Sequence, residues 1–183
     1  TALPIDIDTT FSGDSQFSGC KRLTEMTART LTDSMFYGCS AIRTVKVGSD
    51  VSVIPSNCFM NCTSLRSMDL KGITTFEAGS MANTGLEGKL TLAEVATIGN
   101  KAFAGCRKLG SLDVTANVIG ASAFEGCTSL SSATVCSNEI QRSAFYKCDN
   151  LKKVTLQEVA GMALTSVGSS AFADCPLLSE VVI

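Results

Sequence analysis

The sequence predicts a solenoid of short parallel strands, in which successive coils of one chain stack on one another. Two observations carry this prediction: a Phe-x-x-Cys motif that recurs about every 21 residues, and spaced aliphatic residues behind each copy. A third is the lack of a visible domain boundary, since the 183 residues include only three prolines and no Gly/Ser-rich linker. A coil of this length cannot bury its apolar face alone, so neighbouring coils must bury it jointly.

The copies align on the Phe of the motif. Residues in this slot are Phe17, Phe36, Phe59, Met81, Phe103, Phe124, Phe145 and Phe172. Six of the seven separations between them lie within two residues of 21, and the last is 27. One copy, at 80–92, is degenerate, because Met81 and Thr84 replace its Phe and Cys. Regular spacing together with a fixed internal pattern indicates a repeat architecture.

Each copy is interpreted as a strand, a turn, a second extended piece and a helical turn. The aliphatic residues behind the Cys end in alternation, as in Leu109-x-x-Leu112-x-Val114, which is typical of a strand with one buried face. Leu65, Met68 and Leu70 are equivalent. An Ile or Val before the Phe, often followed by Gly, marks the second extended piece and a sharp turn. The few residues around the Phe have room only for one helical turn.

This pattern, clearest from Ile98 to Val114, resembles the BspA-like (treponemal-type) leucine-rich repeat from about residue 16 to 183. The resemblance implies a leucine-rich-repeat solenoid of the α/β class, with short parallel strands and short helical turns. It implies a curved right-handed horseshoe of about eight repeats with its sheet on the concave face. It also implies a secreted or cell-surface protein, often an adhesin, located outside the cell, at its surface, or in the periplasm or outer membrane. It supplies no catalytic residue.

Three segments depart from the pattern. Residues 1–15 lack the motif and are interpreted as an N-terminal cap or partial repeat, so residues 16–183 form the single repeat domain. The long last interval predicts an excursion from the regular coil at 158–165, as a plain surface bulge or as a functional insertion. In the degenerate copy we expect the sheet to continue through Leu90 and Leu92. The last residues read as a strand, which favours either truncation or cover by another chain.

Nine cysteines occur, and seven occupy the repeat slot: Cys20, Cys39, Cys62, Cys106, Cys127, Cys148 and Cys175. We interpret these as a buried column of small, polarisable side chains. The alternative is a disulfide or metal framework, but stacked equivalents are about 4.8 Å apart and point the same way, which suits neither. Cys58 fills an Ala slot and is expected to be packed. Cys136 follows a strand and is expected to be the most exposed thiol.

Composition excludes several function classes. The chain contains no His, which removes Ser–His–Asp and Cys–His catalysis and His-based metal sites. Its formal charge of −2 gives no basic surface for nucleic acid, and no apolar run is long enough for a membrane helix. We therefore expect no enzyme, no cofactor, no metal, no nucleic-acid partner and no membrane insertion by this segment.

The outward positions of the predicted strands are small and polar, without aromatic residues. The candidate ligand-binding residues on this concave face are Arg43, Lys46, Arg66, Asp69, Lys89, Asp113 and Lys153. Arg43 and Arg66 are expected to be neighbours and to form a small patch that prefers anions. A solvated surface without a partner is the alternative interpretation of the same residues. Tyr37 and Tyr146 are expected on the opposite, convex side.

The favoured function is therefore a non-catalytic binding or adhesion module whose ligand is a protein, such as a host or extracellular-matrix protein. The alternative is a self-associating structural protein whose solenoid faces or ends form homo-oligomers. Light scattering after size exclusion separates these two hypotheses.

Overall fold

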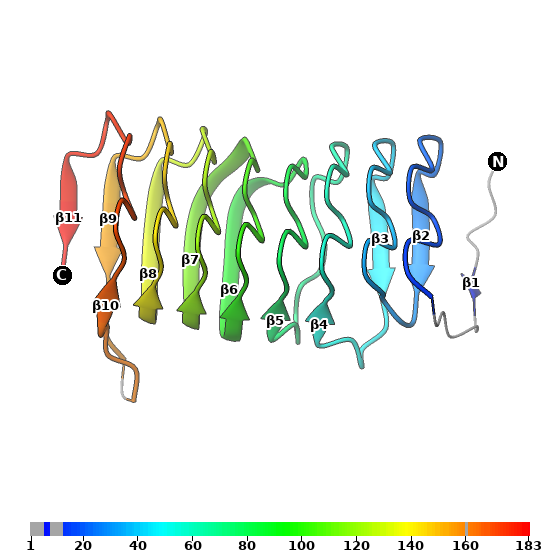
Figure 1. Ribbon diagram of the computed structural model, residues 1–183, viewed down its shortest axis with the longest axis horizontal. Helices are drawn as coiled ribbons and strands as arrows, with labels where there is room; N and C mark the ends of the chain where they lie inside the picture. Colours follow the sequence, from blue (N-terminus) through cyan, green and yellow to red (C-terminus); the bar gives the residue numbers. More distant parts are fainter. Residues whose placement is uncertain (1–5, 8–12, 160) are drawn as a thin grey trace.

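The computed structural model describes residues 6–7, 13–159 and 161–183, and its coils stack side by side along one axis (Figure 1). Most of the predicted cap at 1–15 lies outside the described residues. Within it, β1 (Asp6–Ile7) pairs in parallel with β2 (Glu25–Ala28). The predicted solenoid of parallel strands is confirmed.

The strands form two parallel sheets. The first has the order β1-β2-β3, and the second the order β11-β9-β8-β7-β6-β5-β4, with β10 paired to β8. The remaining strands are β3 (Thr44–Val47), β4 (Val53–Ile54), β5 (Thr75–Phe76), β6 (Glu87–Ile98), β7 (Lys108–Ile119), β8 (Ser132–Ile140), β9 (Lys153–Leu156), β10 (Ser166–Val167) and β11 (Glu180–Val182). Strand β6 runs through Leu90 and Leu92, as predicted for the degenerate copy.

The sheet is interrupted one coil before the degenerate copy, where the sequence predicts a regular strand. Leu65, Met68 and Leu70 lie in a segment without strand structure, so this predicted strand is wrong. The side chain of Asp69 accepts a hydrogen bond from the Lys71 N–H at 3.0 Å, which curls the chain locally instead of extending it. Gly72 follows with a φ of 83°. This local turn competes with strand pairing and separates β3 from β6.

The segment around each Phe is a turn and not the predicted helical turn, because the sign of φ alternates along it. In every coil the residues two before and two after the Phe slot have positive φ, for example Ser122 at 57° and Gly126 at 69°. Helical residues keep φ negative throughout, so the described part of the chain contains no helix. Gly, Asn or Asp fills the second position in most copies, and these residues tolerate positive φ best.

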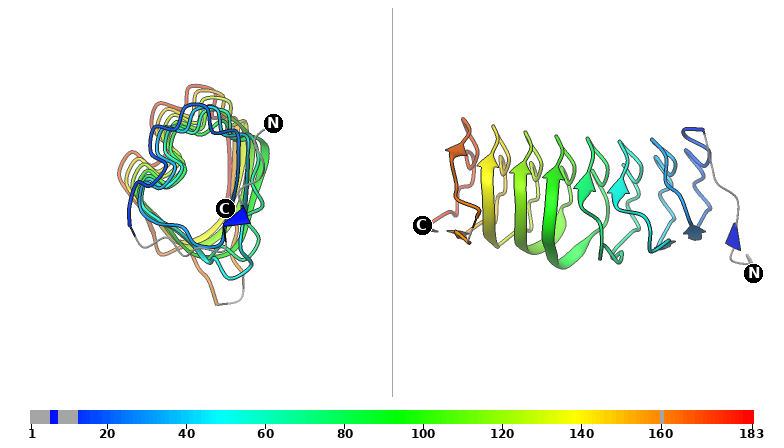
Figure 2. Two further views of the ribbon diagram at one scale, coloured as in Figure 1. Left: turned by 90° about the vertical axis from the view of Figure 1, so that its right-hand side faces the viewer. Right: turned by 90° about the horizontal axis from the view of Figure 1, so that it is seen from below.

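The turns are hydrogen-bonded from coil to coil, as the strands are. The Phe103 N–H donates to the Ala123 carbonyl at 2.8 Å, and the Phe124 N–H donates to the Ala144 carbonyl at 2.7 Å. Strands and turns both fix the distance between neighbouring coils. The coil spacing is therefore similar on the strand side and on the turn side, which leaves the stack little curvature. The stack is nearly straight in its side views (Figures 1 and 2), so its sheet is flatter than a horseshoe.

The Phe residues form a column inside the stack. The rings of Phe103 and Phe124 lie 5.3 Å apart between centroids, with 5° between their planes, and both side chains are fully buried. Offset stacking adds about 0.5–1.5 kcal/mol per pair to the burial of the rings. The predicted ladder of aromatic residues is confirmed.

The slot cysteines form a second column, and each thiol reaches the preceding coil. Cys39, Cys62, Cys106, Cys127, Cys148 and Cys175 each donate to the carbonyl oxygen of the Phe-slot residue one coil earlier, at 3.0–3.4 Å. Burial raises the pKa of Cys62 to about 12 and that of Cys106 to about 11. The nine cysteines all lie in the described part of the chain and are free thiols.

Two expectations about the thiols are wrong. Cys20 belongs to the slot but is exposed, because it lies in the first motif-bearing coil and has no coil of this kind before it. Cys136 is buried rather than exposed, and its Sγ lies 3.6 Å from the Sδ of Met162. Cys58 is fully buried, as expected.

Gly99 and Gly120, each just before a turn, allow close approach between coils. A Cβ added to Gly120 would lie 2.7 Å from the Ile98 carbonyl oxygen, and one added to Gly99 would lie 2.8 Å from that of Phe76. Neither Gly has positive φ. The sequence predicts these glycines to form a sharp turn. In the structure their role is instead to allow close packing against the backbone of the preceding coil.

Candidate binding surface

The outward side chains of β2, β3, β6–β9 and β11, with those of the strandless segment 65–70 between them, form one surface, here called the strand face. Strand register aligns Thr91, Asp113, Thr134 and Thr155 in one row across β6 to β9. A second row contains Lys89, Ser111, Ser132, Lys153 and Glu180. The face therefore carries hydroxyl groups between isolated charges.

The structure places the seven predicted residues on or beside this face. Arg43, Lys46, Arg66, Asp69, Lys89 and Lys153 are exposed, and Asp113 is half-buried. Lys46, Lys89, Asp113 and Lys153 lie within strands, whereas Arg43 precedes β3. Arg66 and Asp69 lie in the segment where the sheet is interrupted.

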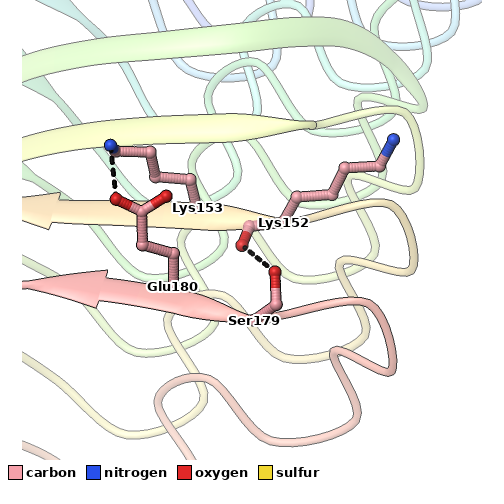
Figure 3. A network of polar contacts seen from close by, with 4 residues as sticks. All are labelled: Lys152, Lys153, Ser179 and Glu180. Atoms are coloured by element: carbon pink, nitrogen blue, oxygen red, sulfur yellow. Dashed lines mark hydrogen bonds and ion pairs between the residues drawn. The ribbon is translucent and has the colours of Figure 1, made fainter.

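Neighbouring coils neutralise several of these charges. Lys89 pairs with Asp113 at 3.3 Å, and Lys153 pairs with Glu180 at 2.6 Å, whereas the side chain of Lys152 extends the opposite way (Figure 3). Arg66 pairs with Glu87 at 3.6 Å, a partner that sequence reasoning missed. Exposed pairs of this kind contribute about 0–1 kcal/mol to stability. Their effect on the face is to leave little net charge over β6 to β11.

Two basic residues of the strand face are free to interact with an anionic partner. Within the described residues, Arg43 and Lys46 form no ion pair. The expected patch of Arg43 with Arg66 is altered, because the Arg66 guanidinium turns to Glu87 in the following coil. The positive end of the strand face is thus centred on β3.

Hollows flank the interruption of the sheet. One of about 740 Å³ lies between β3 and the curled segment, lined by 45–49 together with Asp69, Lys71 and Gly72. Another of about 620 Å³ lies between that segment and β6, lined by 68–73 and 89–95. The sequence signal for both is the Asp69-x-Lys71-Gly72 turn, which lies at the end of the expected strand.

The predicted excursion at 158–165 is present as a narrow loop that projects from the stack, coloured orange in Figures 1 and 2. Val159 and Met162 form an antiparallel bridge, with the two N–H groups donating across it at 3.3 and 2.9 Å. The chain rejoins the stack at Thr165, whose N–H donates to the Asn138 carbonyl at 2.8 Å. Met162 folds back over Cys136, so the loop seals part of the interior.

The described residues gather no group of three His, Cys, Asp or Glu side chains that would hold a metal ion. In the same part of the chain, no helix has the length and apolar character that crossing a membrane requires.

Comparison with known proteins identifies the repeat. Residues 3–110 and 89–183 match the family described as BspA type leucine rich repeat region, with six copies, two fewer than the eight motif-like segments of the sequence. A leucine-rich cell surface protein from Faecalibacterium prausnitzii is 18% identical with a TM-score of 0.56, over 92% of this chain and 62% of that chain. No curated protein sequence matches the chain.

A leucine-rich repeat protein from Eubacterium ventriosum is 16% identical with a TM-score of 0.51, over 87% of this chain and 48% of that one. At these identities the two structures show the fold alone, and the chain spans less than two thirds of each. The family match covers nearly the whole sequence, and its repeat is the coil seen in the structure. The chain belongs to the BspA-type leucine-rich repeat family.

Proposed function

We propose that residues 16–183 form a single non-catalytic domain that binds a partner protein through the strand face. Leucine-rich repeats typically serve as binding scaffolds, and the interior of this one is filled by side chains that pack. The observation that carries the proposal is that Lys46, on β3 and in the lining of a hollow of about 740 Å³, and Arg43, just before β3, form no ion pair among the described residues. The cations Arg66, Lys89 and Lys153 are each balanced by an ion pair with the next coil.

The partner surface that fits this arrangement is acidic. Arg is favoured at interface centres, and opposite charge speeds encounter and fixes orientation. The seven predicted residues, Arg43, Lys46, Arg66, Asp69, Lys89, Asp113 and Lys153, define the contact, and its positive end lies at β3. Adhesion to a host or matrix protein, and display outside the cell or at its surface, are part of the proposal, and the family and the cell surface protein that shares the fold support them.

The test uses a panel of immobilised extracellular-matrix proteins and biolayer interferometry. The variant Arg43→Glu/Lys46→Glu should weaken binding about tenfold or more, because charge-assisted contacts contribute about 1.5–3 kcal/mol each. The matched control is Lys21→Glu/Arg142→Glu, which changes the net charge equally at exposed residues that line neither the hollow beside β3 nor those on the turns. Equal loss in both variants would show that general charge, and not the strand face, controls binding.

Light scattering on the same samples tests the alternative function, which is self-association of the chain into homo-oligomers. A monomer that binds the panel supports recognition of a foreign partner. A concentration-dependent oligomer that binds no panel protein would replace the proposal by self-association.

A further inference from the structure

A separate hollow of about 620 Å³ lies on the turns, and none of the seven strand-face residues lines it. Its floor contains Ala82 and Ala104, which directly follow the Phe slot in the degenerate copy and in the next coil. The same position holds Met60 on one side and Glu125 on the other. The hollow exists because two successive coils carry Ala where their neighbours carry larger side chains.

Close packing between neighbouring coils leaves no room for a larger residue at the floor of this hollow. Gly105 has a φ of 71°, and a Cβ at this position would overlap the side-chain oxygen of Asn83. A smaller hollow of about 300 Å³ shares Asn83, Gly105 and Arg107 with the first and extends it to Lys108. The two hollows together are called the turn groove.

The turn groove is lined by charges of both signs. Lys101, Arg107, Lys108 and Lys147 supply four cations, and Glu125 and Asp149 supply two anions. None of the six forms an ion pair with another described residue. The excess of cations favours an acidic ligand, and the anions disfavour one that is negative along its whole length.

Amide groups supply hydrogen bonds along the same wall. The Asn100 Oδ1 accepts from the Ala121 N–H at 3.0 Å, which leaves its NH₂ group to donate elsewhere. Asn83 donates its NH₂ group to the Asn61 Oδ1 at 2.9 Å, which leaves its oxygen as an acceptor. A donor and an acceptor on neighbouring coils suit a peptide backbone, which presents both.

We infer that the turn groove binds an extended, net-acidic peptide segment of a partner protein, as a second site beside the strand face. Its lining runs from Asn57 to Asp149 over five coils, or about 19 Å at a strand spacing of about 4.8 Å. An extended peptide of about six residues has this length. Its carboxylates meet Lys101, Arg107 and Lys108, and a basic residue meets Glu125 or Asp149. A sulfated or uronic polysaccharide lacks that basic group and fits less well.

The experiment selects peptides from a random heptapeptide phage library on the intact chain, and measures synthetic copies by calorimetry. The selected sequences should be rich in Asp and Glu with one Lys or Arg. Lys101→Glu/Arg107→Glu should weaken their binding about tenfold or more. Arg43→Glu/Lys46→Glu, which alters only the strand face, should leave it unchanged. Loss of peptide binding in only one of these two double variants shows which surface holds the peptide, and so distinguishes this inference from the proposed function.

Two measurements keep the test decisive. Chemical-shift mapping on the unmodified chain should place the peptide at Ala82, Ala104 and Gly105, whatever the stability of the variants. Oligogalacturonate and heparin serve as competing probes. The inference is overturned if either polyanion binds the groove more tightly than the peptides, if the shifts map to β3, or if no acidic peptide is selected.

Discussion

The ring of Phe76 packs against the ring of Phe103 at 4.9 Å between centroids and at 54° between planes. The other described ring pairs of the column lie within 10° of parallel. Phe76 stands five residues before Met81, in the slot that holds Ile98 and Ile119 in the next coils. The fourth coil has therefore exchanged the sizes of two slots: a ring replaces the aliphatic residue, and Met replaces the ring.

This exchange predicts that two changes restore the regular pattern only together. Phe76→Ile should leave a cavity and cost about 1–3 kcal/mol, and Met81→Phe should overpack the column at a similar cost. The double variant Phe76→Ile/Met81→Phe should recover most of the loss, because it rebuilds the column seen at Phe103 and Phe124. Urea denaturation of the four proteins measures this coupling free energy. Strict additivity of the two single effects would show that the slots are independent.

The thiol column predicts that the side-chain volume of Cys127 and its hydrogen-bond donor both contribute to the stability of the fold. Its Sγ donates to the Phe103 carbonyl at 3.4 Å, and that oxygen also accepts the Cys106 N–H. Cys127→Ala should cost about 1–2 kcal/mol for the cavity and the lost donor. Cys127→Thr should cost less, since Thr84 already fills this slot in the degenerate copy and its buried hydroxyl donates to the Met81 carbonyl of its own coil. Equal urea midpoints for the Ala and Thr variants would contradict this account.

Alkaline pH should destabilise the fold through the same thiols. Burial raises the pKa of Cys106 from its ordinary value of 9.0 to about 11, and that of Cys62 to about 12. The folded state therefore holds these protons more tightly than the unfolded state. Their contribution is fully present below pH 9 and is lost as pH rises from 9 through 11 to 12. Denaturation midpoints measured across this range should fall, and should fall less in a Cys106→Val variant.

Met162 is expected to act as the cover of Cys136. Met162→Ala removes the side chain whose sulfur lies 3.6 Å from the Cys136 thiol, so alkylation of Cys136 in the native protein should become faster. The effect on the urea midpoint should be small, because Met162 is only half-buried and lies outside the regular coils. Val159→Ala, a change on the exposed side of the same loop, is the control and should leave the alkylation rate unchanged.

The interior of the fold could be predicted from the sequence because each slot repeats. Phe103, Phe124 and Phe145 appear at one spacing, and stacking is the arrangement that buries them all. The handedness of the turns was missed, although Gly105, Gly126 and Asn83 at equivalent positions carried the signal for positive φ. A single Gly indicates little, whereas Gly, Asn and Asp alternating in one slot indicate a left-handed residue.

The surface could be predicted only in part, because pairing between coils depends on geometry. The exposure of Lys89 and Lys153 follows from strand alternation, but their partners lie 24 and 27 residues away, on the next coil. The interruption at Asp69 arises from competition between a local turn and strand pairing, which alternation alone does not reveal. The burial of Cys136 depends on a loop outside the repeat. The turn groove arises from the absence of side chains at Ala82 and Ala104.

Thiol alkylation of the native chain, followed residue by residue with mass spectrometry, tests most directly the claim that the slots form a closed interior. Exposed Cys20 and half-buried Cys175 should react first, because their sulfur atoms are the most accessible of the slot thiols. Cys62, Cys106 and Cys127 should react only after unfolding. Rapid alkylation of these three in the folded chain, at the rate of Cys20, would contradict the account.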